Sequence, residues 1–247
     1  MPLAYDGGMT RSTRPSRVDE AVDTLTERIV AGDFAPGEAL PGQWDLAEIM
    51  GVSRLTVREA VKTLAAAGMV EVQPGNGTFV RPAREWTDLA ALSRVQLRET
   101  DRSRVAMSLI EIRRMIEVGA ASLCAARRTD DDLERLRATL GGMIAAHAAG
   151  DVPSFSAHDL EFHQAVLQGC ANPFLPLVYD PLHKVLASAR AQTSDHDVIR
   201  DHAIGHHQAI LATIEAGDGP AAAAAMDAHM DQTADDLLTY VLGASPA

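Results

Sequence analysis

The stretch Gly51-Val52-Ser53-Arg54-Leu55-Thr56-Val57-Arg58-Glu59-Ala60-Val61 has the residue order of a tight turn followed by a recognition helix. We expect a short helix over 43–50 to end at Gly51, because a residue without Cβ adopts the left-handed turn conformation easily. Ser53 is placed to cap the next helix, since its hydroxyl can accept a hydrogen bond from an unpaired backbone N–H. The apolar residues that recur at helical spacing, and are expected to pack inward, are Val57, Val61 and Leu64. The stretch predicts a helix-turn-helix.

This spacing leaves basic side chains on the outer face of the second helix. The residues expected to project outward, at positions suited to a DNA groove or its phosphates, are Arg54, Leu55, Arg58 and Lys62. The whole chain carries a net charge of −12, so the argument for DNA binding is local. An acidic body with one basic edge favours a defined docking orientation on DNA. The alternative is a solvated face on an ordinary three-helix core.

A β-hairpin is predicted directly after this helix. Following Gly68, the chain reads Met69-Val70-Glu71-Val72-Gln73, then Pro74-Gly75-Asn76-Gly77, then Thr78-Phe79-Val80. Two β-rich runs around Asn-Gly are a strong hairpin signal, and we expect Asn76-Gly77 at the tip. The two motifs together predict a winged helix-turn-helix.

The chain from about Val18 to Val80 resembles the GntR family of bacterial transcription regulators. The matching segments are Ile29-Val30-Ala31-Gly32-Asp33, Pro36-Gly37, Leu40-Pro41, Leu46-Ala47, Gly51-Val52-Ser53-Arg54, Val57-Arg58-Glu59-Ala60, Leu64, Gly68 and Gly75-Asn76-Gly77-Thr78-Phe79-Val80. The resemblance implies that Arg54, Thr56 and Arg58 touch DNA and that Gly75 reaches the minor groove. We add Ser53 and Lys62, at the same helix face, to the candidate DNA contacts.

Two residues depart from the family pattern. Gln43-Trp44 stands where the family usually has an acidic residue followed by a phosphate-binding arginine, and Leu55 replaces a common small or polar residue. An indole cannot supply the charge-assisted phosphate contact of a guanidinium. We therefore expect a weaker affinity or a different operator.

Composition favours a helical protein of two domains. The 247 residues are 47% hydrophobic but only 4% aromatic, which suits close helix packing better than a β-sandwich. Cys124 and Cys170 fall in apolar helical surroundings, where buried reduced thiols are the default. No apolar run is long enough for a signal peptide or a membrane span, and we expect a cytoplasmic protein with no membrane partner.

The fold class predicted is mainly α: an N-terminal winged helix-turn-helix with a small hairpin wing, then an antiparallel all-α bundle of six or seven helices. Predicted helices cover residues 86–99, 103–128, 130–149, 152–170, 174–193, 196–217 and 219–242. The predicted divisions are a mobile arm 1–16, a DNA-binding domain 17–81, a linker 82–87, a helical domain 88–242 and a tail 243–247.

The bundle contains a second group of chemically active residues. Asp159 and His163 stand four residues apart, so both project from one otherwise apolar helix face. His207 and His229 fall in register with the apolar residues of their own helices. One carboxylate and three imidazoles that converge in a bundle would suit zinc, nickel or manganese. Taken alone, each histidine also fits a hydrogen-bonded core residue.

The bundle sequence is similar to the ligand-binding domain of the FadR subgroup of GntR regulators, called FCD. The resemblance covers residues 103–240 and rests on the segments Phe155 to His163, His207-Gln208-Ala209-Ile210-Leu211 and Ala225-Met226-Asp227-Ala228-His229. It implies a metal held by Asp159, His163, His207 and His229. His206 directly precedes His207, so a shift of one residue is the main alternative for this ligand.

Arg113 occupies the arginine of the subgroup's Arg-x-x-hydrophobic-Glu pattern, which here ends at Glu117. A guanidinium beside a metal with open positions could clamp a carboxylate, which implies a small organic acid as effector. The alternative is an ion pair with Glu117 or with a neighbouring helix.

These features predict a homodimeric regulator, a repressor by default, that binds a near-palindromic operator in double-stranded DNA and is not an enzyme. Two alternatives stay open: a metal that is purely structural or is itself sensed, and a metal-dependent enzyme fused to a DNA-binding domain.

Overall fold

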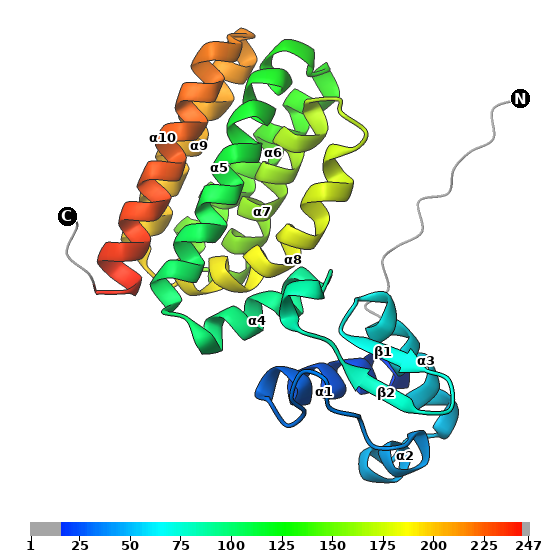
Figure 1. Ribbon diagram of the computed structural model, residues 1–247. Coiled ribbons are helices and arrows are strands. Elements are labelled where there is room, and N and C mark those ends of the chain that lie inside the picture. The colour runs from blue at the N-terminus through cyan, green and yellow to red at the C-terminus, as the bar shows by residue number, and fades with distance from the viewer. Residues whose placement is uncertain (1–15, 244–247) are drawn as a thin grey trace, which may run out of the picture. The chain divides into compact units, whose positions relative to one another are not determined.

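The structure is a computed structural model that describes residues 16–243, apart from the side chains of 99, 183–184 and 187–193. Apart from Ser16 and Gly243, the predicted arm 1–16 and tail 243–247 lie outside the described residues. The chain divides into two compact units, one up to Val95 and one from Gln96 onward. Figure 1 shows the course of the chain through both units, and each is described here by itself.

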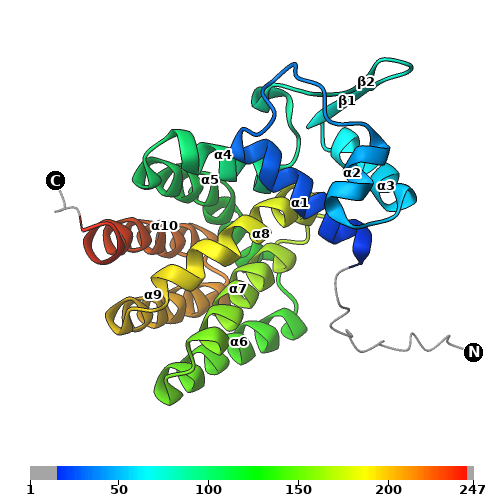
Figure 2. The ribbon, with the colours of Figure 1, turned by 90° about the horizontal axis from the view of Figure 1, so that it is seen from below.

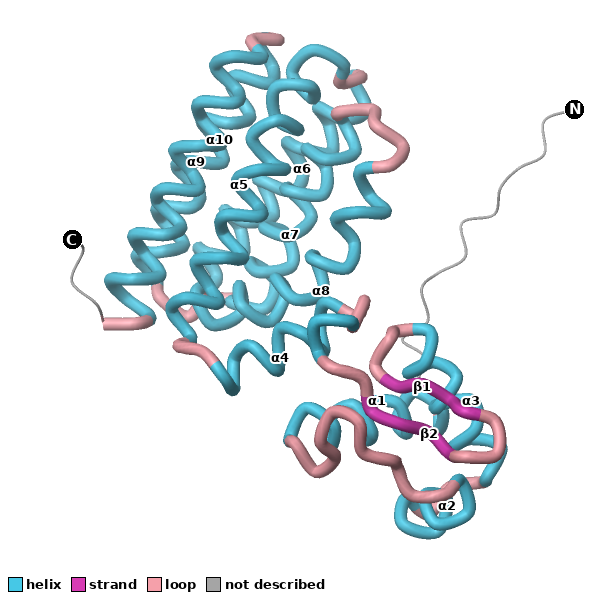
Figure 3. Tube along the Cα trace, in the orientation of Figure 1, coloured by secondary structure: helices cyan, strands magenta, loops and turns pink. Residues whose placement is uncertain are grey.

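The first unit is a winged helix-turn-helix. Its elements are α1 (Arg17–Ala31), α2 (Gln43–Met50), α3 (Arg54–Ala66), β1 (Val70–Gln73), β2 (Gly77–Val80), a short 3-10 helix (Ala83–Glu85) and the first part of α4 (Leu89–Glu99). Within the described part of the chain, strands occur only in this hairpin, drawn in magenta in Figure 3. The predicted fold class is confirmed.

Local chemistry explains where these helices begin and end. Ser16 begins α1 with a capping box, because it accepts from the Asp19 backbone while the Asp19 carboxylate accepts from the Ser16 backbone. Gly51 ends α2 with φ of 62°, as the sequence predicts. Ser53 Oγ then accepts from the Thr56 backbone N–H at 3.1 Å, which caps α3. The turn between α2 and α3 is therefore fixed by two residues.

The wing differs from its prediction at the tip. Gln73 pairs with Gly77, so the loop is Pro74-Gly75-Asn76, and Asn76 N donates to Gln73 O at 3.0 Å. Gly75 is left-handed with φ of 79°. Proline followed by left-handed glycine is the pattern of a type II turn. The predicted Asn-Gly tip is wrong because Pro74 fixes the first central residue of the turn and so leaves the left-handed position to Gly75.

The first unit extends further along the chain than the predicted linker 82–87. Trp86 packs against the apolar core of this unit, and its Nε1 donates to Arg81 O at 2.9 Å. Ala91 is buried in the same core. These apolar side chains follow the wing in sequence but pack into the core of the first unit. The boundary between the two units therefore lies at 95/96, inside α4.

The second unit is an all-α bundle. Its described elements are α5 (Arg102–Arg127), α6 (Asp130–Ala149), α7 (Val152–Gly169), α8 (Leu175–Thr193), α9 (Asp197–Ala216), α10 (Gly219–Asp236) and a π-helical turn (Leu237–Val241). α5 packs against α7, α9 and α10, while α6 packs against α7 and α9 (Figures 1 and 2). α7 thereby packs against both α5 and α6, and its inward face contributes buried side chains to the bundle.

The bundle core follows from helical periodicity. Its largest fully buried side chains are Leu136, Met143, Phe162, His163, Ile210, Ile214, Met226 and Met230. Cys124 and Cys170 are buried and free of disulfides, as predicted. Burial raises the pKa of the Cys124 thiol to about 12, so it stays protonated. No described helix is long and apolar enough to cross a membrane.

Candidate functional site

The opening of α3 presents the predicted DNA contacts to solvent. Val57, Val61 and Leu64 are buried beneath the helix. Their burial turns the opposite face outward, where the exposed basic side chains are Arg54, Arg58 and Lys62. Thr56 is half-buried beside the Ser53 cap, with their hydroxyl oxygens 2.9 Å apart. The structure therefore gathers these residues on one exposed helix end.

The three basic side chains have different partners. Arg58 Nε lies 3.4 Å and Lys62 Nζ 3.0 Å from Glu59 Oε1. A hydrogen bond from Lys62 lowers the pKa of Glu59, so the carboxylate is charged at neutral pH. The Arg54 guanidinium instead lies over the Trp44 ring, with Cζ 4.8 Å from the ring centroid. Gly75, at the wing tip, is exposed and belongs to the same unit.

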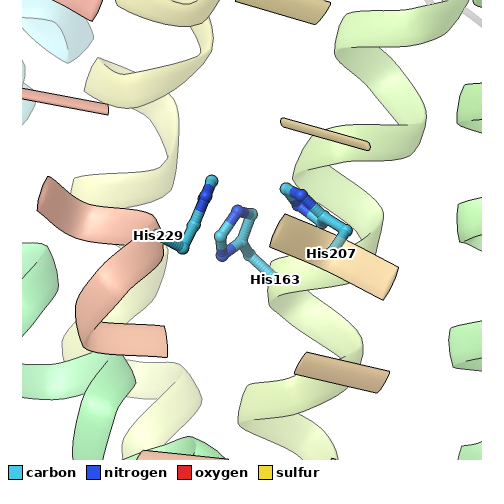
Figure 4. Close-up of side chains that lie close together, drawn as sticks. All are labelled: His163, His207 and His229. Carbon is cyan, nitrogen blue, oxygen red and sulfur yellow. The ribbon is translucent and has the colours of Figure 1, made fainter. Parts of the chain in front are cut away.

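The four predicted metal ligands meet in the bundle. His163 comes from α7, His207 from α9 and His229 from α10, and their ligand nitrogens lie within 4.8 Å of one another. Figure 4 shows the three rings converging. Asp159 Oδ1 lies 3.2 Å from His207 Nε2 and 3.9 Å from His163 Nε2. All four residues are buried.

Each imidazole has an oxygen at its Nδ1. His163 Nδ1 lies 2.5 Å from Glu117 Oε2, His207 Nδ1 lies 2.6 Å from Ala203 O, and His229 Nδ1 lies 3.1 Å from Gln232 Oε1. At His207 and His229 the oxygen accepts from Nδ1–H, which leaves the Nε2 lone pair available to a metal. Sequence reasoning missed these outer partners. The position of Glu117 one helical turn after Arg113 is visible in the sequence and could have indicated its role. No sequence pattern indicates the other two partners.

Protonation also fits a metal centre. Burial, and then the neighbouring His207 and His163, hold the pKa of His229 well below its usual value, so its ring is neutral. His207 Nε2 is buried and makes no hydrogen bond with any described residue, although Asp159 lies beside it. A buried lone pair of this kind is costly unless something occupies the space before it. A divalent cation bound by the three histidine nitrogens and the Asp159 carboxylate would satisfy that requirement.

Arg113 lies against this cluster. Its Nε donates to Glu117 Oε1 at 2.8 Å, and its Nη2 lies 3.3 Å from His163 Nε2. Burial lowers its pKa, but the charge of Glu117, its hydrogen bond with Glu117 and the charge of Asp159 outweigh that effect, so the pKa is raised above its ordinary value. The hydroxyl of Tyr179 donates to the same Glu117 carboxylate. The intramolecular ion pair that sequence reasoning left open is therefore present, and the guanidinium also faces the cluster.

A cavity adjoins the cluster on the side of α9 and α10. The cavity volume, taken as the space open to the centre of a water molecule, is about 40 Å³. Its polar lining residues are Arg113, Asp159, Ser194, His229, Gln232, Thr233 and Asp236, and its apolar ones are Phe155, Ile199 and Ala203. A ligand there would meet one guanidinium, two carboxylates, one imidazole, one amide and two hydroxyls.

The remaining described histidines lie outside the cluster. His206 is half-buried, whereas His207 is buried in the cluster, which supports the predicted register. His202 is exposed, and His158 and His196 are half-buried. His147 groups with Asp197 and Asp201 near the surface, where Arg200 already donates to His147 Nδ1 at 3.2 Å. Among the residues that the structure describes, the three-histidine group is the one whose ligand atoms are all buried and converge.

Comparison with known proteins agrees with both parts of this description. Residues 17–80 match the bacterial regulatory proteins of the gntR family, and residues 108–232 match the FCD domain. The chain is 30% identical to the galactonate operon transcriptional repressor of Escherichia coli K12, over 84% of this chain and 90% of that protein. It is 31% identical to the regulator LutR of Bacillus subtilis, over 85% and 95% of the two chains.

A solved structure shows the same fold. The Lar regulator of the Listeria monocytogenes agr system superposes with a TM-score of 0.66 at 17% identity, over 93% of this chain and all of that one. Together with the exposed basic end of α3, these matches identify the class of protein. The chain belongs to the GntR family of bacterial regulatory proteins and is a DNA-binding transcription regulator with an FCD domain.

Proposed function

We propose that this regulator is a homodimeric repressor whose DNA affinity is controlled by a small hydroxycarboxylate bound beside a metal in the FCD domain. The observation that carries the proposal is the convergence of Asp159 and three imidazoles on one buried point next to Arg113. The repressor role is also supported by the galactonate operon repressor, which is similar over most of both chains.

The DNA-binding role is divided among the residues at the start of α3. In a homodimer, two such helices would read two half-sites of a near-palindromic operator. Arg54 or Arg58 would donate to guanine edges in the major groove. Ser53, Thr56 and Lys62 would contact phosphates, and Gly75 would bring the wing backbone into the flanking minor groove.

The metal site is assigned to Asp159, His163, His207 and His229. Zinc, nickel and manganese all accept such nitrogen and oxygen ligands. A divalent metal held there would supply a Lewis-acidic position that is open to an exogenous oxygen. Glu117, Ala203 O and Gln232 would hold the three rings in the orientation that directs Nε2 inward.

The chemistry of the cavity indicates the class of effector. Arg113 would hold a carboxylate through its planar fork, while Asp236, Gln232 and Thr233 offer partners for hydroxyl groups. The cavity is small, since one water alone needs about 10–15 Å³ of the same kind of space. This favours two- or three-carbon hydroxycarboxylates over a six-carbon acid such as galactonate.

The effector acts through differential affinity. An acid that binds the DNA-free form more tightly lowers DNA affinity by the same factor, because the two equilibria are linked. A carboxylate at Arg113 competes with its contacts to Glu117 and His163, and this is the local change that would favour one packing of α5 against α7.

Calorimetry tests the proposal. Glycolate, lactate and glycerate are titrated into zinc-loaded and zinc-stripped protein, with acetate, propionate and galactonate as comparisons. We expect the short hydroxycarboxylates to bind the loaded form at least tenfold more tightly than the stripped form. The same acids should release a labelled duplex, selected by this protein from a random library.

The outcomes separate the alternatives. Zinc binding without any acid binding would favour a structural or sensed metal, and release of DNA by zinc itself would favour metal sensing. Equal acid affinity for loaded and stripped protein would refute the role of the metal in effector binding. Turnover of any of these acids would favour the enzyme alternative.

A further inference from the structure

An exposed tryptophan marks the DNA-reading end of the first unit. Trp44, the second residue of α2, is 69% exposed. The buried residues of the same helix are Leu46 and Ala47, so the indole is not needed for the core. Because most of its surface is exposed, it is expected to have a role outside the core. Its contact with α3 indicates what that role is.

That contact is with the first residue of the recognition helix. Arg54 Cζ lies 4.8 Å from the Trp44 ring centroid, within the range of a cation–π interaction. Among the described residues, no hydrogen bond or ion pair engages the Arg54 guanidinium. Arg58 and Lys62 differ, because both lie within reach of Glu59. Trp44 therefore holds the Arg54 guanidinium over its ring and accepts no hydrogen bond from the guanidinium N–H groups.

We propose that Trp44 is a positioning residue that preorganises Arg54 for base reading, an inference that rests on the proposed contact of Arg54 with DNA. A bidentate contact with guanine uses two N–H groups in the guanidinium plane. The Trp44 ring restricts the Arg54 side chain without accepting hydrogen bonds from those donors. Trp44 carries no charge and makes no charged phosphate contact itself. Its proposed contribution is to the specificity of the contact made by Arg54.

The size of the effect follows from cation–π energetics. An exposed pair of this kind changes a binding constant by about two- to fivefold, and a pair desolvated under DNA by more. Because a disordered arginine still contacts phosphates anywhere, the loss is expected for the cognate sequence and not for random DNA. The ratio of the two affinities is therefore the informative quantity.

A double-mutant cycle tests the inference. Full-length wild type, Trp44→Leu, Arg54→Ala and the double variant are titrated against the duplex selected from a random library by wild type, and against a scrambled duplex. Trp44→Phe retains an aromatic face. Ile49→Ala is the control, because Ile49 is a 61% exposed apolar residue of the same helix.

We expect Trp44→Leu to weaken binding of the selected duplex about fivefold and to leave the scrambled duplex within twofold. Trp44→Phe should recover most of the loss, and Trp44→Leu should have no further effect when Arg54 is alanine. Equal losses on both duplexes, or an undiminished loss in the Arg54→Ala background, would overturn the inference. An Arg54→Ala variant that binds like wild type would instead remove the DNA-contact role of Arg54 itself, and the inference with it.

Discussion

The metal site can be tested by one substitution and its neighbour. His207→Leu removes a proposed ligand from the centre of the cluster, whereas His206→Leu changes the half-buried residue beside it in α9. Leucine has a volume close to that of histidine, so the bundle can repack around it. The pair therefore separates loss of a ligand from loss of a histidine in this part of the helix.

The structure gives the size of the expected effects. In metal-free protein, the buried His207 Nε2 without a hydrogen-bond partner costs about 1–3 kcal/mol. Its edge-to-face contact with Phe162, at a centroid distance of 4.5 Å, stabilises by about 0.5–1.5 kcal/mol. The two effects oppose each other. The free energy of unfolding of the metal-free His207→Leu variant should therefore lie within about 2 kcal/mol of the wild-type value.

Metal should then distinguish the two variants. Zinc at a hundred times its Kd stabilises a folded protein by about 2.7 kcal/mol, which raises Tm by roughly 5–11 °C for a unit of this size. Thermal unfolding is followed by circular dichroism in chelator and in buffered zinc, and bound zinc is measured after gel filtration. Wild type and His206→Leu should show the full shift and one zinc per chain.

If His207→Leu keeps the full zinc-dependent rise in Tm and binds one zinc per chain, the cluster is not the binding site. A wild type that ignores zinc, nickel and manganese alike would also contradict the metal site. Loss of the shift in His206→Leu and not in His207→Leu would show that the register is displaced by one residue.

Four further substitutions test other parts of the molecule. Arg58→Ala should weaken binding of the selected duplex by about 1–3 kcal/mol at fixed salt and relax the base preference. Lys62→Ala should weaken binding of all duplexes alike and reduce the slope of log affinity against log salt concentration by about 1. Fluorescence anisotropy over a salt series measures both. Arg113→Lys keeps the charge but not the fork, so acid-induced release from DNA should weaken while zinc stoichiometry stays at one. A backbone hydrogen bond from Thr129, opposed by partial burial, lowers the pKa of Asp132, so Asp132→Asn should cost about 0.5–1 kcal/mol at neutral pH. This loss should shrink as the pH falls below 3.8, the ordinary pKa, and disappear only below the lowered pKa of the folded state. A difference in unfolding free energy that stays constant with pH would contradict it.

Local rules predicted most of the fold because they act within a few residues. Gly51 and Ser53 set the boundary between α2 and α3 by backbone conformation and capping, and neither depends on distant contacts. The helices of the bundle follow from apolar spacing in the same way. The wing tip was mispredicted where two local signals competed, Pro74-Gly75 against Asn76-Gly77, since the strand register decides between them.

The candidate site was predictable only in part. Helical spacing shows that His163, His207 and His229 face inward, but not what lies at their Nδ1 atoms. Those partners come from another helix, from the backbone and from the next turn. The contact between Trp44 and Arg54 has the same origin, because it depends on how α2 and α3 cross.

The outer contacts of His229 connect the metal centre to the effector cavity. Gln232 accepts from His229 Nδ1 and donates to Asp236, and Asp236 lies 3.0 Å from His202 Nδ1. Gln232 and Asp236 also line the cavity. An acid whose hydroxyl binds either residue therefore competes for the groups that orient a proposed metal ligand. Linkage then requires acid and metal to change each other's affinity by one common factor. A carboxylate with equal affinity for zinc-loaded and zinc-stripped protein cannot act through this centre, whatever it does to DNA binding.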